Sequence, residues 1–246
     1  YNVRIDIDIE GVTSESRSTE SIETLAGHET RTVFVPVSID EKILAITEDG
    51  NRGIRFRIVY NTDKSKYYYT ENFEVQVYNK NAITWDKTGR LGSFIMPRDA
   101  TVSSFSRQVI SGIDEKPARG ISKKIFTAII LFNSLNAAGI TYVNDPRNMS
   151  AGIDYVQLPG ETLKKKAGDC DDLTALYASL LEGVGISTAI ATIPGHVFLL
   201  FNTEVIGSSA SEISDDPQSY LIHEGTVWIP VEVTSLREGF CEAWKK

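Results

Sequence analysis

The sequence lacks any long uninterrupted run of apolar residues. Its longest runs, Ala128 to Phe132 and Val197 to Phe201, contain five residues each. A helix that crosses the hydrocarbon core of a bilayer needs about 20 such residues. We therefore expect no membrane-spanning segment in this chain.

Cysteine and positive charge are both scarce. The two cysteines, Cys170 and Cys241, form no Cys-x-x-Cys pair, and the histidines show no zinc-like spacing, so we expect neither a disulfide framework nor a metal site. Asp and Glu outnumber Lys and Arg by 33 to 25, which gives a formal net charge of −8. Binding along nucleic-acid phosphates needs clustered positive charge, so nucleic acid is not an expected partner.

Common nucleotide-binding and serine-hydrolase motifs are also missing, because no P-loop, Gly-x-Ser-x-Gly or Gly-x-Gly-x-x-Gly is present. The remaining composition is ordinary, with 41% hydrophobic and 24% charged residues, and indicates a folded globular protein. A length of 246 residues favours one large or two modest domains. The chain opens at Tyr1 without a leader, which we interpret as a processed chain or a fragment of a longer protein.

The first hundred residues show the period of two that is typical of half-buried strands. This alternation covers residues 3–9, 33–39, 54–60 and 73–77. Between the first two, residues 13–24 are almost entirely Ser, Thr and Glu, and we expect a mobile loop. Residues 1–100 are therefore predicted to form an antiparallel β-sandwich domain.

Beyond residue 100 the hydrophobic period becomes helical. Residues 102–110 follow helical spacing, and residues 121–138 place a stripe of Ile, Ala, Phe and Leu on one face before Gly139, a usual stop signal. Further helical and then strand-like segments follow. Residues 101–246 are expected to form a second domain, and the predicted class is α+β, with helices packed on an antiparallel sheet.

Cys170 is the first candidate for chemistry. It lies in Gly168-Asp169-Cys170-Asp171-Asp172, where Asp169 is a good N-cap and Asp172 occupies the capping-box position. A cysteine in the first turn of a helix is favoured as the reactive thiolate by the helix dipole, whereas three neighbouring aspartates oppose that form. The alternative is a small core residue on the same stripe as Leu173 and Tyr177.

His196 is the candidate base. It follows the turn-forming dipeptide Pro194-Gly195 and opens an apolar strand, on which it is expected to share a core-directed face with Phe198 and Leu200. A histidine in that position is also compatible with a hydrogen-bonded core residue.

Glu232 is the third candidate, within the strand-like segment Trp228-Ile229-Pro230-Val231-Glu232. A carboxylate inside an apolar run needs a buried partner, and an imidazole would supply one. A thiol at a helix start, a base on a following strand and a carboxylate on the next can together carry out acyl transfer.

These segments, together with Glu161-Thr162-Leu163 and Gly195-His196-Val197-Phe198, resemble bacterial transglutaminase-like domains. The resemblance covers roughly residues 104–244 and implies a papain-like fold. It also implies that Cys170 is the nucleophile, that His196 is the general base and acid, and that Glu232 orients His196. Much of that superfamily has Asp at the third position, so Glu232 is a departure.

The oxyanion hole would use the backbone N–H of Cys170 and one further donor, for which Gln157 is the candidate. We expect a cysteine hydrolase that acts on amide or peptide bonds through a thioester, with hydrolysis preferred over amine crosslinking and with no cofactor. The substrate is expected to be a protein, a peptide or a cell-envelope component, and the location extracytoplasmic or in the cell envelope. The alternative is a non-catalytic binding or scaffold module that keeps the fold.

Overall fold

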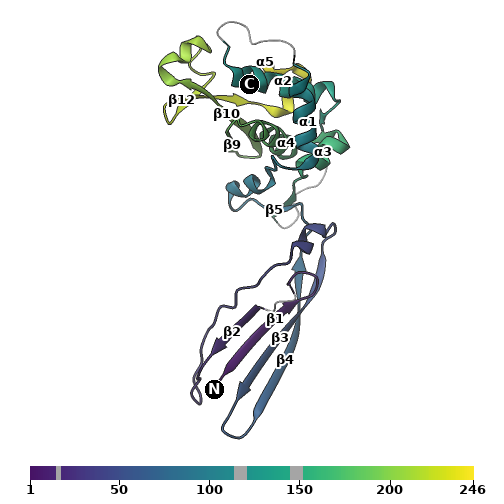
Figure 1. Ribbon diagram of the computed structural model, residues 1–246, viewed down its shortest axis with the longest axis vertical. Coiled ribbons are helices and arrows are strands. Elements are labelled where there is room, and N and C mark those ends of the chain that lie inside the picture. Colours follow the sequence, from purple (N-terminus) through teal and green to yellow (C-terminus); the bar gives the residue numbers. More distant parts are fainter. Residues whose placement is uncertain (15–17, 114–120, 145–151) are drawn as a thin grey trace. The chain divides into compact units, whose positions relative to one another are not determined.

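The computed structural model describes residues 1–14, 18–113, 121–144 and 152–246 (Figure 1). The chain divides into two compact units, Tyr1–Ala82 and Ile83–Lys246. Helices and strands both contribute substantially, and the two four-stranded sheets are antiparallel. The expected α+β class is confirmed.

The first unit contains one four-stranded antiparallel sheet and a short 3-10 helix, η1 (Glu41–Ala45). Its strands are β1 (Val3–Ile9), β2 (Ser18–Ile22), β3 (Gly50–Asn61) and β4 (Lys66–Val77), in the order β2-β1-β3-β4. The register places Ile5 opposite Ile58 and Ile7 opposite Phe56, so the alternating apolar side chains share one face. The described part of this unit contains one sheet, whereas a sandwich needs two.

Two details of the first unit differ from the sequence expectation. Residues 33–39 form no regular strand: Ile39 makes a single bridge to Thr13, and Phe34 is 89% exposed. β1 already pairs with β2 and β3 along its two edges, so it offers no edge to this segment. Conversely, the polar segment 13–24 contains β2, because backbone hydrogen bonds to β1 hold it despite its lack of apolar side chains.

The second unit combines helices with a four-stranded antiparallel sheet of order β11-β12-β10-β9. Two short strand pairs, β5 with β7 and β6 with β8, lie outside that sheet. The elements are β5 (Ala82–Thr84), η2 (Thr88–Phe94), α1 (Ala100–Ser111), α2 (Lys123–Ala137), β6 (Thr141–Tyr142), β7 (Ile153–Tyr155), α3 (Pro159–Lys165), β8 (Ala167–Gly168), α4 (Cys170–Gly183), β9 (Thr188–Ile193), β10 (His196–Ile206), η3 (Gly207–Glu212), β11 (Leu221–His223), β12 (Thr226–Val231), η4 (Val233–Glu238) and α5 (Phe240–Lys245).

The two helices predicted after residue 100 are confirmed, and side chains cap both. Asp99 accepts hydrogen bonds from the backbone of Thr101 and Val102 at the start of α1, and Ser122 accepts one from Ile125 at the start of α2. α2 ends just before Gly139, which has a φ of 81°. Within the described ranges, no helix combines the length and apolar character that crossing a bilayer requires.

α4 is the central helix of the second unit. Residues 171–181 are all buried, and the helix contacts α1, α2, α3 and the strands β9 and β10. Tyr177 packs edge-on against Phe132 at 5.4 Å and donates a hydrogen bond to the carbonyl of Ala128 at 2.9 Å. Because α4 is packed on all sides, its first residue, Cys170, has a fixed position.

The boundary between the units lies earlier than the expected residue 100. Ile83, Leu91 and Phe94 are buried in one apolar cluster with Val156, Val197 and other residues of the second unit. The change of hydrophobic period near residue 100 marks the first α-helix, whereas the chain joins the second core before that helix begins.

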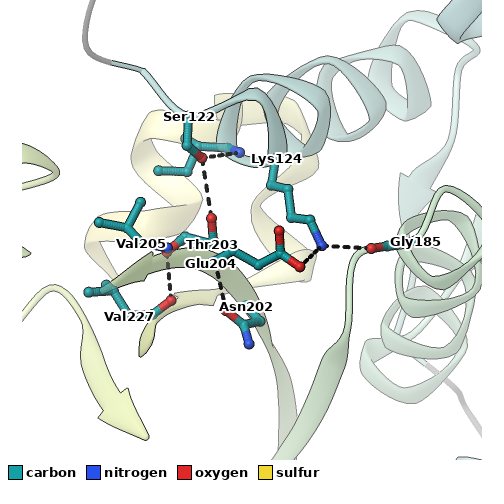
Figure 2. A network of polar contacts seen from close by, with 9 residues as sticks. Ser122, Lys124, Gly185, Asn202, Thr203, Glu204, Val205 and Val227 are labelled. Atoms are coloured by element: carbon teal, nitrogen blue, oxygen red, sulfur yellow. Dashed lines mark hydrogen bonds and ion pairs between the residues drawn. The ribbon is translucent and has the colours of Figure 1, made fainter. Parts of the chain in front are cut away.

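A polar network ties the start of α2 to the irregular part of β10 (Figure 2). The ammonium group of Lys124 lies 2.6 Å from the carboxylate of Glu204. The buried hydroxyl of Thr203 donates to the carbonyl of Val227 at 2.7 Å. The register of β10 against β12 shifts in this region, so these side chains supply hydrogen bonds where the regular ladder is interrupted.

Candidate active site

Cys170 is the first residue of α4, as the sequence predicts. The carboxylate of Asp169 accepts a hydrogen bond from the backbone of Asp172 at 3.3 Å, and that of Asp172 accepts one from the backbone of Asp169 at 3.4 Å. This capping box fixes where the helix begins. Gly168 permits the close packing, since a Cβ there would lie 2.7 Å from the Cβ of Asp172. The motif therefore fixes the position of the Cys170 side chain at the first residue of α4.

The surroundings of Cys170 keep its thiol protonated. Burial raises the pKa of Cys170 to about 11, and the charges of Asp171 and Asp169 add to this effect, while backbone hydrogen bonds from Val197 and Asp171 lower it. The helix dipole alone would favour the thiolate, but burial and the acidic neighbours outweigh it. The resting site therefore holds a neutral thiol that needs a base to remove its proton.

His196 begins β10 after the Pro194-Gly195 turn, in which Gly195 has a φ of 76° that glycine adopts without strain. The expectation that His196 faces the core is wrong. The core face of β10 carries Val197, Leu199 and Phe201. Because α4 packs on β10, apolar side chains fill that face, and the side chain of His196 lies on the opposite one with 29% of its surface exposed.

Glu232 pairs with His196, as the sequence predicts. The Nε2 atom of His196 lies 2.6 Å from the Oε2 atom of Glu232, and the other carboxylate oxygen accepts hydrogen bonds from the backbone and hydroxyl of Thr234 at 3.0 and 2.6 Å. Burial raises the pKa of Glu232, but the hydrogen bonds from Thr234 and His196 outweigh burial and leave that pKa below its usual value. An ionised Glu232 only accepts, so we assign the proton to Nε2, which leaves Nδ1 as a free base.

The elements that carry the thiol and the imidazole meet at one junction of the fold. The N–H of Val197 donates toward the sulfur, and Val197 directly follows His196 in β10. Val197 and Cys170 also pack in the same apolar cluster. The structure thus brings the start of α4 to the start of β10, beside the His196–Glu232 pair.

A cavity of about 520 Å³ opens beside this pair. His196 and Glu232 line it together with the apolar side chains of Phe198, Pro230 and Trp244. The indole of Trp244 is held by a hydrogen bond from its Nε1 to the carbonyl of Ser219 at 2.6 Å. Cys170 does not line this cavity, so the cavity is lined by the imidazole of His196 and not by the sulfur.

Gln157 does not fulfil its expected role in this geometry. Its side-chain nitrogen donates to the carbonyl of Ala167 at 3.2 Å and to the carboxylate of Asp172. Its backbone N–H also donates to Asp172, at 2.6 Å. With both side-chain N–H groups engaged, Gln157 anchors the capping box and has no donor to offer an oxyanion.

Three carboxylates surround the start of α4. Asp169, Asp171 and Asp172 each place one oxygen within 4.8 Å of the others. Burial raises the pKa of Asp171 to about 10, reinforced by its hydrogen bond with Asp169, and burial raises that of Asp172 to about 6. Carboxylate oxygens suit hard cations such as Ca²⁺, so among the described residues this group could hold a metal. A retained proton on Asp171 relieves the charge repulsion within the group.

Sequence reasoning missed two residues near the pair. Thr234 follows Glu232 by two positions. Its backbone N–H donates a hydrogen bond to the side chain of Glu232, which is the N-cap of η4. That spacing is a local signal that could have been recognised. Tyr142 lies within electrostatic reach of Cys170, Asp169 and Glu232, and no sequence signal indicates it, because it reaches the site through strand pairing.

Comparisons with protein-family models, with curated proteins and with solved structures give no match for this chain. The functional conclusion therefore depends on the geometry of the site.

Proposed function

We propose that this protein is a cysteine-dependent acyl-transfer enzyme acting on amide or peptide bonds, a transglutaminase-like hydrolase with a thioester intermediate. The observation that carries the proposal is the 2.6 Å contact between His196 and Glu232, at the junction where the N–H of Val197 meets the sulfur of Cys170. We assign the second unit to a papain-like core, which is supported by α4 packing against an antiparallel sheet.

The reaction begins from a neutral thiol and a neutral imidazole. Nδ1 of His196 accepts the thiol proton while the sulfur attacks the carbonyl carbon, and the carbonyl π electrons move to oxygen. The tetrahedral intermediate collapses to a thioester as His196 gives its proton to the departing amine. Water then attacks the thioester with His196 again as base, which releases a carboxylic acid and restores the thiol.

Hydrolysis is preferred over transfer to an amine. Amine transfer requires that water be kept from the thioester. Asp216 and Gln218, which line the cavity beside His196, are both exposed, so water has access to the imidazole. We propose a protein, peptide or cell-envelope component as the substrate, since each contains amide bonds.

The second candidate is a non-catalytic binding or scaffold module with the same fold. The observation that favours it is the pKa of Cys170, which burial and the acidic neighbours raise to about 11. In such a module the His196–Glu232 pair would be a structural ion pair.

Acylation by p-nitrophenyl acetate separates these candidates. The enzyme is expected to release a burst of p-nitrophenolate and to carry one acetyl group on Cys170, whereas the exposed Cys241 serves as an internal reference thiol. His196→Ala should slow acetylation of Cys170 at least 100-fold, since general-base catalysis contributes about 10²–10⁴-fold, and should leave Cys241 unaffected. Equal acetylation rates in the native protein and in His196→Ala would support the scaffold instead.

A second assay separates hydrolysis from crosslinking. Ammonia release from a glutamine-containing peptide is measured with and without an added primary amine. We expect the free acid as the main product in both cases. A product that consists mainly of the amine conjugate would overturn the preference for hydrolysis.

A further inference from the structure

Attack on a carbonyl places negative charge on its oxygen, and enzymes stabilise that charge with preorganised donors. The backbone N–H of Cys170 is one such donor, because the first N–H groups of a helix have no partner within the helix. The side-chain donors of Gln157 are taken by Ala167 and Asp172. The site therefore needs a second donor from elsewhere.

Strand β6 brings another residue with a hydroxyl, Tyr142, beside the start of α4. Tyr142 pairs with Gly168 in the parallel β6–β8 ladder, and the N–H of Val143 donates to the carbonyl of Gly168 at 2.9 Å. Gly168 is followed directly by Asp169 and Cys170. β6 also contacts η4, which begins immediately after Glu232. Tyr142 is thus held between the element that carries the thiol and the element that carries the carboxylate.

The hydroxyl of Tyr142 is chemically suited to donate. Burial raises the pKa of the Tyr142 hydroxyl, and the negative charges of Asp169, Glu232 and Cys170 in its thiolate form raise it further, so the hydroxyl keeps its proton when charge develops at the site. Among the residues that the structure describes, this hydroxyl has no hydrogen-bond partner, and the side chain is 40% exposed. A substrate oxygen could therefore reach it.

We infer that Tyr142 is a catalytic residue whose hydroxyl donates a hydrogen bond to the oxyanion formed when Cys170 attacks a carbonyl. This role rests on the proposed function. It assigns oxyanion stabilisation to the backbone N–H of Cys170 and the hydroxyl of Tyr142, and it leaves Gln157 as the residue that positions Asp172.

The inference is tested with two reagents on Tyr142→Phe, which removes only the hydroxyl oxygen. p-Nitrophenyl acetate reacts with the sulfur through a tetrahedral oxyanion. Iodoacetamide reacts by displacement of iodide at a saturated carbon, forms no oxyanion and needs no such donor. We expect Tyr142→Phe to slow acetylation of Cys170 by about 10²-fold or more and to change its alkylation less than about twofold.

Tyr78→Phe is the matched control, because Tyr78 is also 40% exposed and lies in the first unit. It should leave both rates unchanged. Thermal unfolding of each variant checks that the fold is intact.

The outcomes distinguish this inference from the proposed function. If Tyr142→Phe acetylates at the native rate, the inference fails and the proposed function stands. If acetylation and alkylation fall by the same factor, Tyr142 only shapes the surroundings of the thiol and the inference also fails. If the native protein shows no acetylation of Cys170 that depends on His196, the proposed function fails and the inference fails with it.

Discussion

At the scale of single residues, the neighbours of Glu232 fix its carboxylate beside the imidazole of His196. Glu232 differs from the Asp found in much of the superfamily that the sequence resembles, yet it lies 2.6 Å from the imidazole. Thr234 binds one carboxylate oxygen through both its backbone and its hydroxyl, and the backbone N–H of Glu232 donates to Ala243 at 2.8 Å. The extra methylene is thus held in one conformation, and we expect an ordered pair.

The charge of Asp169 is predicted to suppress the reactivity of the thiol. Asp169→Asn removes this charge but keeps an N-cap side chain that accepts a hydrogen bond. Because the charge of Asp169 raises the pKa of Cys170, its removal lowers that pKa from about 11. At any pH below that value more of the sulfur is then thiolate, and alkylation by iodoacetamide is faster, by ~10-fold for each unit of pKa.

The measurement is the rate of Cys170 alkylation across the alkaline pH range, followed by peptide mass. Asp99→Asn is the control, since Asp99 is likewise an N-cap, at the start of α1. If the alkylation rate of Cys170 depends on pH in Asp169→Asn as it does in the native protein, this electrostatic effect is ruled out. The same holds if Asp169→Asn and Asp99→Asn shift that pH dependence equally.

Local signals in the sequence predict the elements that carry the site. Two of these signals depend only on neighbours in the chain: the capping motif around Cys170 and the Pro194-Gly195 turn. The third, the need of Glu232 for a buried partner, depends on a single interaction. Local signals do not determine which face of a strand packs on the core. On β10 both alternating sets are largely apolar, so the sequence cannot tell which set packs against α4 and places His196 on the wrong one.

Strand β10 is predicted to depend on Thr203, which replaces regular ladder bonds where the register shifts. Thr203→Val removes the hydroxyl that donates to Val227 and accepts from the backbone of Val205. Leaving buried backbone groups unpaired costs about 1–3 kcal/mol each. We expect the free energy of unfolding, measured in urea, to fall by about that amount.

Thr192→Val on β9 is the matched control, because Thr192 is exposed. Thr192→Val should change the free energy of unfolding by no more than about 0.5 kcal/mol. Equal effects of the two substitutions would show that the hydroxyl of Thr203 contributes no specific stabilisation.

At the scale of the whole molecule, the boundary between the two units lies where the chain joins the second hydrophobic core, and not where the period of the hydrophobic pattern changes. Ile83, Leu91 and Phe94 precede the first α-helix but are buried in the second unit. Sequence periodicity detects the type of element, whereas the partner of an apolar segment depends on contacts that are distant in the chain. Tyr142, for which we propose the role of oxyanion donor, is likewise brought near Cys170 by a contact distant in the chain, because it pairs with Gly168.

The boundary predicts how fragments behave. A fragment of residues 83–246 should unfold cooperatively and be acetylated on Cys170 at the rate of the full chain. A fragment of residues 101–246 lacks Leu91 and Phe94, and each buried side chain lost costs roughly 2–5 kcal/mol. Thermal unfolding measures the stability of each fragment, and the rate of Cys170 acetylation measures whether its site is intact. Equal stability of the two fragments would place the boundary after all near residue 100.

The central claim is that Cys170, His196 and Glu232 act as one unit, and a double-mutant cycle on Cys170 acetylation tests it most directly. His196→Ala and Glu232→Gln should each slow acetylation, by roughly 10²-fold or more for the histidine. Because Glu232 acts through the imidazole, the double variant should be no slower than His196→Ala alone. Losses that multiply in the double variant, or no loss in either single variant, would contradict the claim.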